Sequence, residues 1–106
     1  MPPIEEGENS IDLGANLKRG LEYVGGRLKI TNEKLYFYPH FLNIQKRKLV
    51  IAINEIKTVN KGRILGISPN GVVIHLKDGT SHKFTIGMPW SNKKAEIINY
   101  IDSLIA

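Results

Sequence analysis

The sequence contains no cysteine, and this absence excludes several kinds of chemistry at once. Without thiols the chain forms no disulfide, holds no zinc ribbon or iron–sulfur cluster and offers no thiol nucleophile. Long apolar runs are missing too: the longest, Leu49–Ile53, is far below the roughly 20 residues that a membrane-spanning helix needs. A secretory signal begins with basic residues and continues with an apolar stretch, whereas the first residues here are acidic, so we expect no such signal. Together these absences predict a cytoplasmic protein with no transmembrane segment.

Enzyme motifs are missing as well. The sequence has no Gly-x-Ser-x-Gly elbow, no P-loop, no His-Glu-x-x-His pair and no glycine-rich dinucleotide fingerprint. The three histidines, His40, His75 and His82, show no metal-ligand pattern. We therefore expect a non-enzyme with no catalytic residue, no metal and no cofactor.

The charge is unevenly distributed along the chain. Lys and Arg number 15 against 10 Asp and Glu, yet residues 1–12 hold four of the acids and no Lys or Arg. We interpret 1–12 as a loose acidic tail and 13–106 as one basic domain. Either the basic domain binds an anionic partner, with the tail as a competitor, or the excess charge only confers solubility.

Alternation of polar and apolar residues predicts short strands after the tail. Gly20 marks a bulge or break in the first strand, and Gly25-Gly26 and Ser68–Gly71 are expected to form turns. In all we expect about seven strands, at 15–23, 27–31, 34–38, 49–53, 56–64 and on either side of a turn at 77–80.

The turn at 77–80 allows two registers. A two-residue turn at Asp78-Gly79 would mix core and surface residues on one face of the hairpin. A three-residue loop with Gly79 in the left-handed conformation keeps the faces separate, so we favour it. It pairs Leu76 with Thr80, Ile74 with His82, and Val72 with Phe84.

The last segment changes to a helical period. Its apolar residues recur every three or four positions, which predicts an amphipathic helix that Ser91 or Asn92 caps at its N-terminus. These residues are Ile97, Ile98, Ile101, Leu104 and Ile105.

The segment Gly26-Arg-Leu-Lys-Ile-Thr-Asn-Glu-Lys-Leu-Tyr-Phe37 resembles the core motif of the GRAM domain, a branch of the pleckstrin-homology-like (PH-like) superfold. Similar pieces follow at 41–45, 53–56, 65–71 and 77–84, so the resemblance spans roughly 14–105. Two departures are Ala52, where the family has Pro, and Trp90, which lacks the family's preceding Arg. The resemblance implies a bent antiparallel sandwich or partly open barrel that the C-terminal helix caps. It also implies a module that binds phosphoinositides, other anionic lipids or a protein.

The segment 39–48 is the first candidate site. Phe41 and Leu42 precede three consecutive cations, Lys46, Arg47 and Lys48. Cations near an anionic leaflet contribute about 1 kcal/mol each, and burying each apolar side chain adds roughly 1.5–3 kcal/mol. The total corresponds to weak, salt-sensitive, peripheral membrane binding. The alternative is that Phe41 and Ile44 pack on the core and leave the cations in a solvated loop.

The second candidate is a group of cations along the first strands. Arg27 and Lys29 are expected to face outward and to bracket a phosphate near Gly25-Gly26; the alternative is that they are ordinary solvent-facing residues of a half-buried sheet. The group comprises Lys18, Arg19, Arg27, Lys29 and Lys34.

Three functions remain open at this point. The favoured one is a non-catalytic module that binds anionic membrane lipid or a protein partner. The second is a small-barrel nucleic-acid binder, which is less favoured because only Tyr36 and Tyr38 stand beside basic residues as a stacking platform. The third is a structural domain that oligomerises through an open sheet edge.

Overall fold

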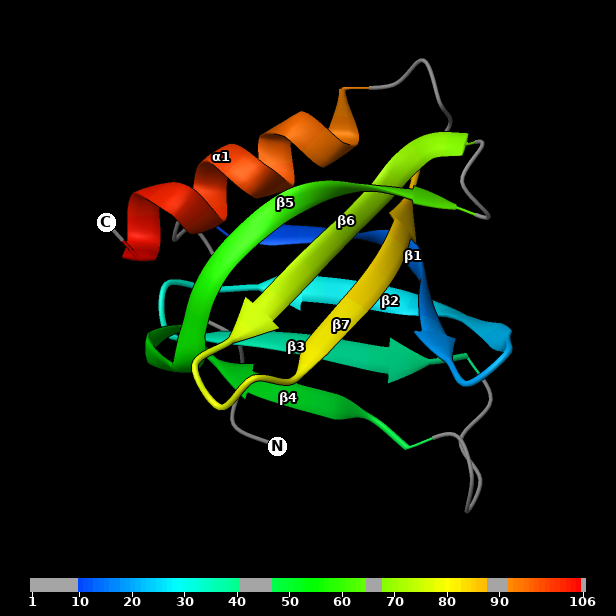
Figure 1. The fold of residues 1–106 in the computed structure, drawn as a ribbon, viewed down its shortest axis with the longest axis horizontal. Coiled ribbons are helices and arrows are strands. Elements are labelled where there is room, and N and C mark those ends of the chain that lie inside the picture. The colour runs from blue at the N-terminus through cyan, green and yellow to red at the C-terminus, as the bar shows by residue number, and fades with distance from the viewer. Residues whose placement is uncertain (1–9, 41–46, 65–67, 88–91, 106) are drawn as a thin grey trace.

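The computed structural model describes residues 10–40, 47–64, 68–87 and 92–105. Within these ranges the chain forms seven strands, one short 3₁₀ helix (η1) and one α-helix (Figure 1). In chain order they are β1 (Ile11–Arg19), β2 (Glu22–Ile30), β3 (Lys34–Pro39), β4 (Leu49–Ala52), η1 (Ile53–Glu55), β5 (Ile56–Ile64), β6 (Ser68–Leu76), β7 (Ser81–Ile86) and α1 (Lys93–Ile105).

All seven strands belong to one antiparallel sheet, in the order β4-β3-β2-β1-β7-β6-β5. The sheet curls into a half-barrel, and α1 lies across its open side beside β5 (Figure 1). The expected class, a mainly β domain of about seven strands that a C-terminal helix caps, is confirmed. Because the two edge strands β4 and β5 do not pair with each other, the barrel stays open between them.

The β1–β2 hairpin differs from the sequence prediction. β1 begins at Ile11, so Ile11 and Asp12, which the prediction placed in the tail, lie in a strand. The chain turns at Gly20-Leu21, and Arg19 pairs with Glu22. The turn predicted at Gly25-Gly26 is wrong, since both glycines lie inside β2.

The close approach of β3 explains why β2 has a glycine at position 26. A Cβ at Gly26 would lie 2.3 Å from the Tyr38 carbonyl oxygen, 2.8 Å from Phe37 Cζ and 2.9 Å from Pro39 Cα. Glycine is therefore required here because the two strands pack closely. A sequence pattern alone does not distinguish this role of glycine from its role in a turn.

The β6–β7 hairpin confirms the favoured register. Val72 pairs with Phe84, Ile74 pairs with His82, and Gly79 has a φ of 94°. The Asp78 side chain accepts hydrogen bonds from the Thr80 amide at 2.9 Å and the Thr80 hydroxyl at 2.6 Å, which fixes the loop.

The turn predicted at Ser68–Gly71 is wrong, because β6 already begins at Ser68. The ladder between β5 and β6 is irregular at this point: Gly62 pairs with Gly71 and Ile64 with Ser68. Pro69 falls between these pairs. An irregular ladder accommodates proline, because a residue at a bulge does not have to donate a backbone N–H to the neighbouring strand.

β4 ends one residue earlier than predicted, and β3 extends to Pro39. Ile53, predicted as the last residue of a strand, opens η1, where its amide donates to the Glu33 carbonyl at 2.9 Å. The residue stays buried, so its apolar character serves the core in either conformation.

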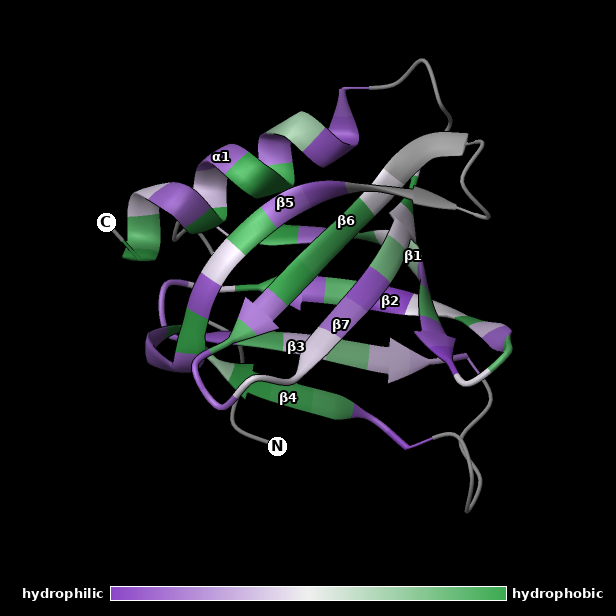
Figure 2. Ribbon diagram, in the orientation of Figure 1, coloured by the Kyte–Doolittle hydropathy of each residue, from purple (hydrophilic) through white to green (hydrophobic). Residues whose placement is uncertain are grey.

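The core fills the inside of the half-barrel under α1. Apolar and polar residues alternate along the second half of β2, whereas β6 carries a continuous apolar run (Figure 2). One face of each strand lies in the core. The helix buries Ile97 and Ile101 completely and packs Ile98, Leu104 and Ile105 against the same core. Phe37 and Phe84 meet at its centre with ring centroids 5.8 Å apart.

Candidate functional site

One end of the half-barrel carries the β1–β2 turn, and the end of β3 and the start of β4 lie at the same end (Figure 1). The turn has two central residues, and hairpins of this length favour a positive φ at the first of them. Gly20 supplies that conformation, with φ at 61°. Leu21, the second, is fully exposed at 102% relative accessibility. A tight turn therefore presents an apolar side chain to solvent on a well-paired hairpin of two nine-residue strands.

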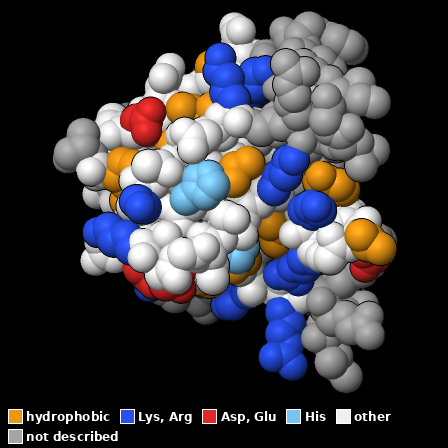
Figure 3. Space-filling model, in the orientation of Figure 1, with side chains coloured by type: hydrophobic (Ala, Val, Ile, Leu, Met, Phe, Trp, Pro, Cys, Tyr) orange, Lys and Arg blue, Asp and Glu red, His pale blue; other side chains and the backbone are white. Residues whose placement is uncertain are grey.

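Cations lie near this turn, together with the exposed acid Glu22 that follows Leu21. The Arg19 guanidinium, at the end of β1, donates a hydrogen bond to the Arg47 carbonyl just before β4. This bond joins the β1–β2 hairpin to the residues that enter β4. We call this end of the molecule the basic end and define it by Leu21 with Lys18, Arg19, Arg47 and Lys48. Figure 3 shows Lys and Arg side chains in a stripe on the side of the view where these elements lie.

His82 lies next to the basic end on the inner face of β7. Burial lowers the pKa of His82, and the positive charge of Arg19 lowers it further, whereas Asp78 acts in the opposite direction. At neutral pH the imidazole is therefore neutral. An anion bound beside Arg19 would offset the positive charge and raise this pKa.

Arg27 and Lys29 lie elsewhere, on the outer face of the first four strands. Both contact Asp12: the Arg27 guanidinium at 2.8 Å and the Lys29 ammonium at 3.7 Å. Lys29 also lies 5.9 Å from the centre of the Tyr38 ring. The outward orientation predicted for both residues is confirmed, but Asp12 partly neutralises them.

Three of the predicted lipid-binding residues, Phe41, Leu42 and Lys46, lie outside the described residues. Their role stays a prediction. The described residues on either side of them, His40 and Arg47, are both exposed, and the His40 amide donates to the Gly25 carbonyl at 3.0 Å.

Sequence reasoning missed Leu21 because it placed the turn at Gly25-Gly26 and left Leu21 inside a strand. The signal was present in Gly20, which was interpreted as a bulge or break. Arg19 was grouped with Arg27 and Lys29, yet the structure brings it to Arg47 instead.

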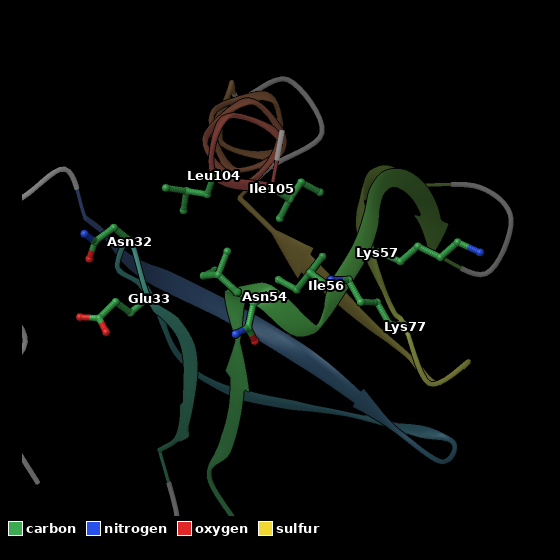
Figure 4. A pocket seen from close by; sticks show the side chains of 9 residues that line it. Asn32, Glu33, Asn54, Ile56, Lys57, Lys77, Leu104 and Ile105 are labelled. Atoms are coloured by element: carbon green, nitrogen blue, oxygen red, sulfur yellow. The ribbon is translucent and has the colours of Figure 1, made fainter.

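A groove of about 560 Å³ lies between the end of α1, η1, the β2–β3 turn and the start of β5 (Figure 4). Its apolar lining comes from Ile53, Ile56, Leu104 and Ile105. Lys57 and Lys77 stand on one side and Asn32 and Glu33 on the other (Figure 4). The Lys77 amide donates to the Glu55 carbonyl at 2.9 Å, which ties Lys77 to η1.

Within the described ranges, no three His, Asp or Glu side chains gather as metal ligands would. No helix among the described residues is both long enough and apolar enough to cross a bilayer.

The GRAM domain family model matches residues 2–104, nearly the whole chain. The chain belongs to the GRAM domain family. This assignment confirms the resemblance drawn from the 26–37 motif, and no curated protein matches this GRAM domain.

Solved structures that resemble this GRAM domain include PH domains. The N-terminal PH domain of human ARAP2 gives a TM-score of 0.71 at 10% identity, over 95% of this chain and 83% of that one. The Slm1 PH domain in complex with inositol-4-phosphate gives 0.69 at 15% identity, over 91% and 94%. The same domain in complex with phosphoserine gives 0.68 at 14%, over 91% and 96%. At these identities the likeness establishes the PH-like fold.

Proposed function

We propose that this GRAM domain is a non-catalytic module that attaches peripherally to anionic lipid surfaces through its basic end. The observation that carries the proposal is the fully exposed Leu21 on a two-residue turn, with Arg19 beside it and bonded to Arg47. An apolar tip with cations nearby matches an interface in which acyl chains lie beneath anionic headgroups.

Magnitudes indicate how strong this attachment is. Burying Leu21 contributes roughly 1.5–3 kcal/mol, and the four cations of the basic end about 1 kcal/mol each near an anionic leaflet. The sum corresponds to a Kd of about 10–100 µM before ordering costs. Such binding is reversible, and because salt screens exposed charges it weakens as ionic strength rises.

The PH-like neighbours support a phosphate-bearing ligand. The Slm1 PH domain is in complex with inositol-4-phosphate in one of these structures and with phosphoserine in another. Both present a compact anion that Arg side chains bind well. If the protein did not bind vesicles, a protein would replace lipid as the proposed partner of the basic end.

One feature of the outer sheet face argues against nucleic acid. Tyr36 and Tyr38 stack on each other at 5.9 Å with planes 9° apart, and Lys29 lies over Tyr38. A base-stacking platform needs free ring faces, and these contacts occupy part of that surface.

The test is co-sedimentation with vesicles of phosphatidylcholine alone and of phosphatidylcholine with phosphatidylserine, at low and physiological salt. We expect binding only with the anionic lipid. The double variant Arg47→Ala/Lys48→Ala loses two cations, so its affinity should fall about 30-fold. Leu21→Ser should weaken binding about tenfold or more, because the apolar insertion is lost.

The matched control is Lys34→Ala/Lys61→Ala, which removes two exposed cations away from the basic end. If the control weakens binding as much as Arg47→Ala/Lys48→Ala does, binding depends on overall charge and the proposed site is wrong. Absence of pelleting with either vesicle would refute the lipid proposal and point to a protein partner. A single-stranded RNA that binds as tightly as the anionic vesicles would favour the nucleic-acid alternative instead.

A further inference from the structure

The groove beside the end of α1 combines an apolar floor with two cations. Leu104 and Ile105 supply the accessible part of the floor, since Ile53 and Ile56 are buried, and Lys57 and Lys77 stand at one side (Figure 4). Exposed apolar surface of this kind favours an apolar side chain, and the lysines favour carboxylates next to it. The chemistry that fits is a short peptide with one apolar residue followed by acids.

The chain carries such a segment in its first nine residues. Pro2, Pro3 and Ile4 are followed by Glu5 and Glu6, with no Lys or Arg before position 18. The family match begins at residue 2, so this segment falls inside the matched region.

The fold brings the start of β1 to the groove. Ile11 pairs with Ile30, the last residue of β2, and the β2–β3 turn follows with Asn32 at the groove. Figure 4 shows the beginning of β1 beside Asn32. Six peptide steps separate Ser10 from Ile4, which allows a reach of about 20 Å.

We propose that residues 2–9 dock in this groove, with Ile4 against Leu104 and Ile105 and with Glu5 and Glu6 near Lys57 and Lys77. Because the tail is covalently attached next to the groove, weak binding is sufficient to keep it there. A short flexible linker gives an effective concentration of about 1 mM or more, so a contact with a Kd near 1 mM is already half occupied. The occupant is the protein's own tail, and the proposal does not depend on lipid binding.

The basic end is a poorer destination for the tail. β1 has nine residues, so about 27 Å of strand separates Ile11 from the Leu21 turn. A nine-residue tail would have to extend almost fully to reach that distance, whereas the groove begins next to its origin.

Carbodiimide cross-linking of the full chain tests the proposal. The reagent joins Glu carboxylates to Lys amines that lie in contact, and peptide mass spectrometry identifies the pairs. We expect Glu5 and Glu6 to link to Lys57 and Lys77 at least tenfold more often than to the exposed Lys61. Ile4→Asp should reduce these links to the Lys61 level, while Asn9→Asp, which adds the same charge without removing the apolar group, should retain them.

Two outcomes would overturn the proposal. Links spread evenly over the exposed lysines would mean that the tail does not dock. Links between chains in a mixture of ¹⁴N- and ¹⁵N-labelled protein would mean that a second copy fills the groove.

Amide NMR gives an independent readout. The resonances of Asn54, Lys57 and Lys77 should shift between wild type and Ile4→Asp, whereas those of Arg47 and Lys83 should stay. Unchanged groove resonances would also overturn the proposal. Equal thermal unfolding of Ile4→Asp and Asn9→Asp verifies that neither substitution acts through the fold.

Discussion

Gly26→Ala tests whether the packing of β3 on β2 requires glycine. The added Cβ would lie within 3.0 Å of three atoms, of which the Tyr38 carbonyl oxygen and Pro39 Cα belong to the backbone. Neither backbone atom can rotate away, so β3 must shift or the strands must separate. Overpacking of this kind costs about 1–3 kcal/mol, and we expect the upper end here.

Gly14→Ala is the matched control, because a Cβ at position 14 meets nothing within 4 Å. Neither glycine has the left-handed φ that would strain an alanine, so the two variants differ mainly in contact. The control should stay within about 0.5 kcal/mol of wild type.

Urea unfolding, followed by far-UV circular dichroism, measures both changes in the free energy of unfolding. For Gly26→Ala we also expect a Tm about 10–20 °C lower. An unchanged slope in urea would verify that stability rather than compactness has changed. If Gly26→Ala proves as stable as Gly14→Ala, then the close approach of β3 does not explain the glycine.

Three further predictions concern the site and the core. Because the pKa of His82 lies below its ordinary value of 6.5, the unfolded chain takes up the proton at a higher pH than the folded chain, so the free energy of unfolding should fall as pH drops below about 6.5. In urea titrations, His82→Gln should lose this part of the pH dependence. An unchanged profile in His82→Gln would disprove the role of His82. ¹H NMR titration should also show the pKa of His82 rising when inositol phosphate is added, and a constant pKa would argue against an anion beside Arg19. Phe84→Ala should cost about 3–5 kcal/mol in urea unfolding, because it removes a fully buried ring that packs on Phe37, and a loss below 1 kcal/mol would contradict the assigned core.

Local patterns predicted much of the fold. The β6–β7 register followed from keeping Val72, Ile74 and Phe84 on one face, since a slip by one residue turns every side chain over. The helical spacing of Ile97 and Ile101 likewise identified the residues that α1 buries. Both signals are periodic, and neither depends on distant parts of the chain.

The errors arose where one residue type serves two purposes. The composition of Gly25-Gly26 is typical of a turn, but Gly26 lies within β2, where the absence of a side chain allows β3 to pack closely. Pro69-Asn70-Gly71 also reads as a turn, yet an irregular β5–β6 ladder accommodates it within a strand. In both cases the deciding contact comes from a neighbouring strand.

The candidate site was only partly predictable for the same reason. Arg47 was predicted as a lipid-binding residue from a local run of cations. In the structure its carbonyl accepts a hydrogen bond from the Arg19 guanidinium, 28 residues away in the sequence. The exposed Leu21 depended on the position of the turn, which the sequence prediction misplaced. Lys57, Lys77 and Ile105 line one groove only because the sheet curls and α1 crosses it.

The most direct measurement of the central claim is the environment of position 21 on a membrane. Because the sequence has no cysteine, Leu21→Cys and the control Lys61→Cys each offer a single thiol for an environment-sensitive nitrobenzoxadiazole label. On anionic phosphatidylserine vesicles at low salt, we predict a blue shift and increased emission at position 21 and no change at position 61. Equal responses at the two positions, or no response at position 21 while the protein is bound, would contradict insertion of the β1–β2 turn.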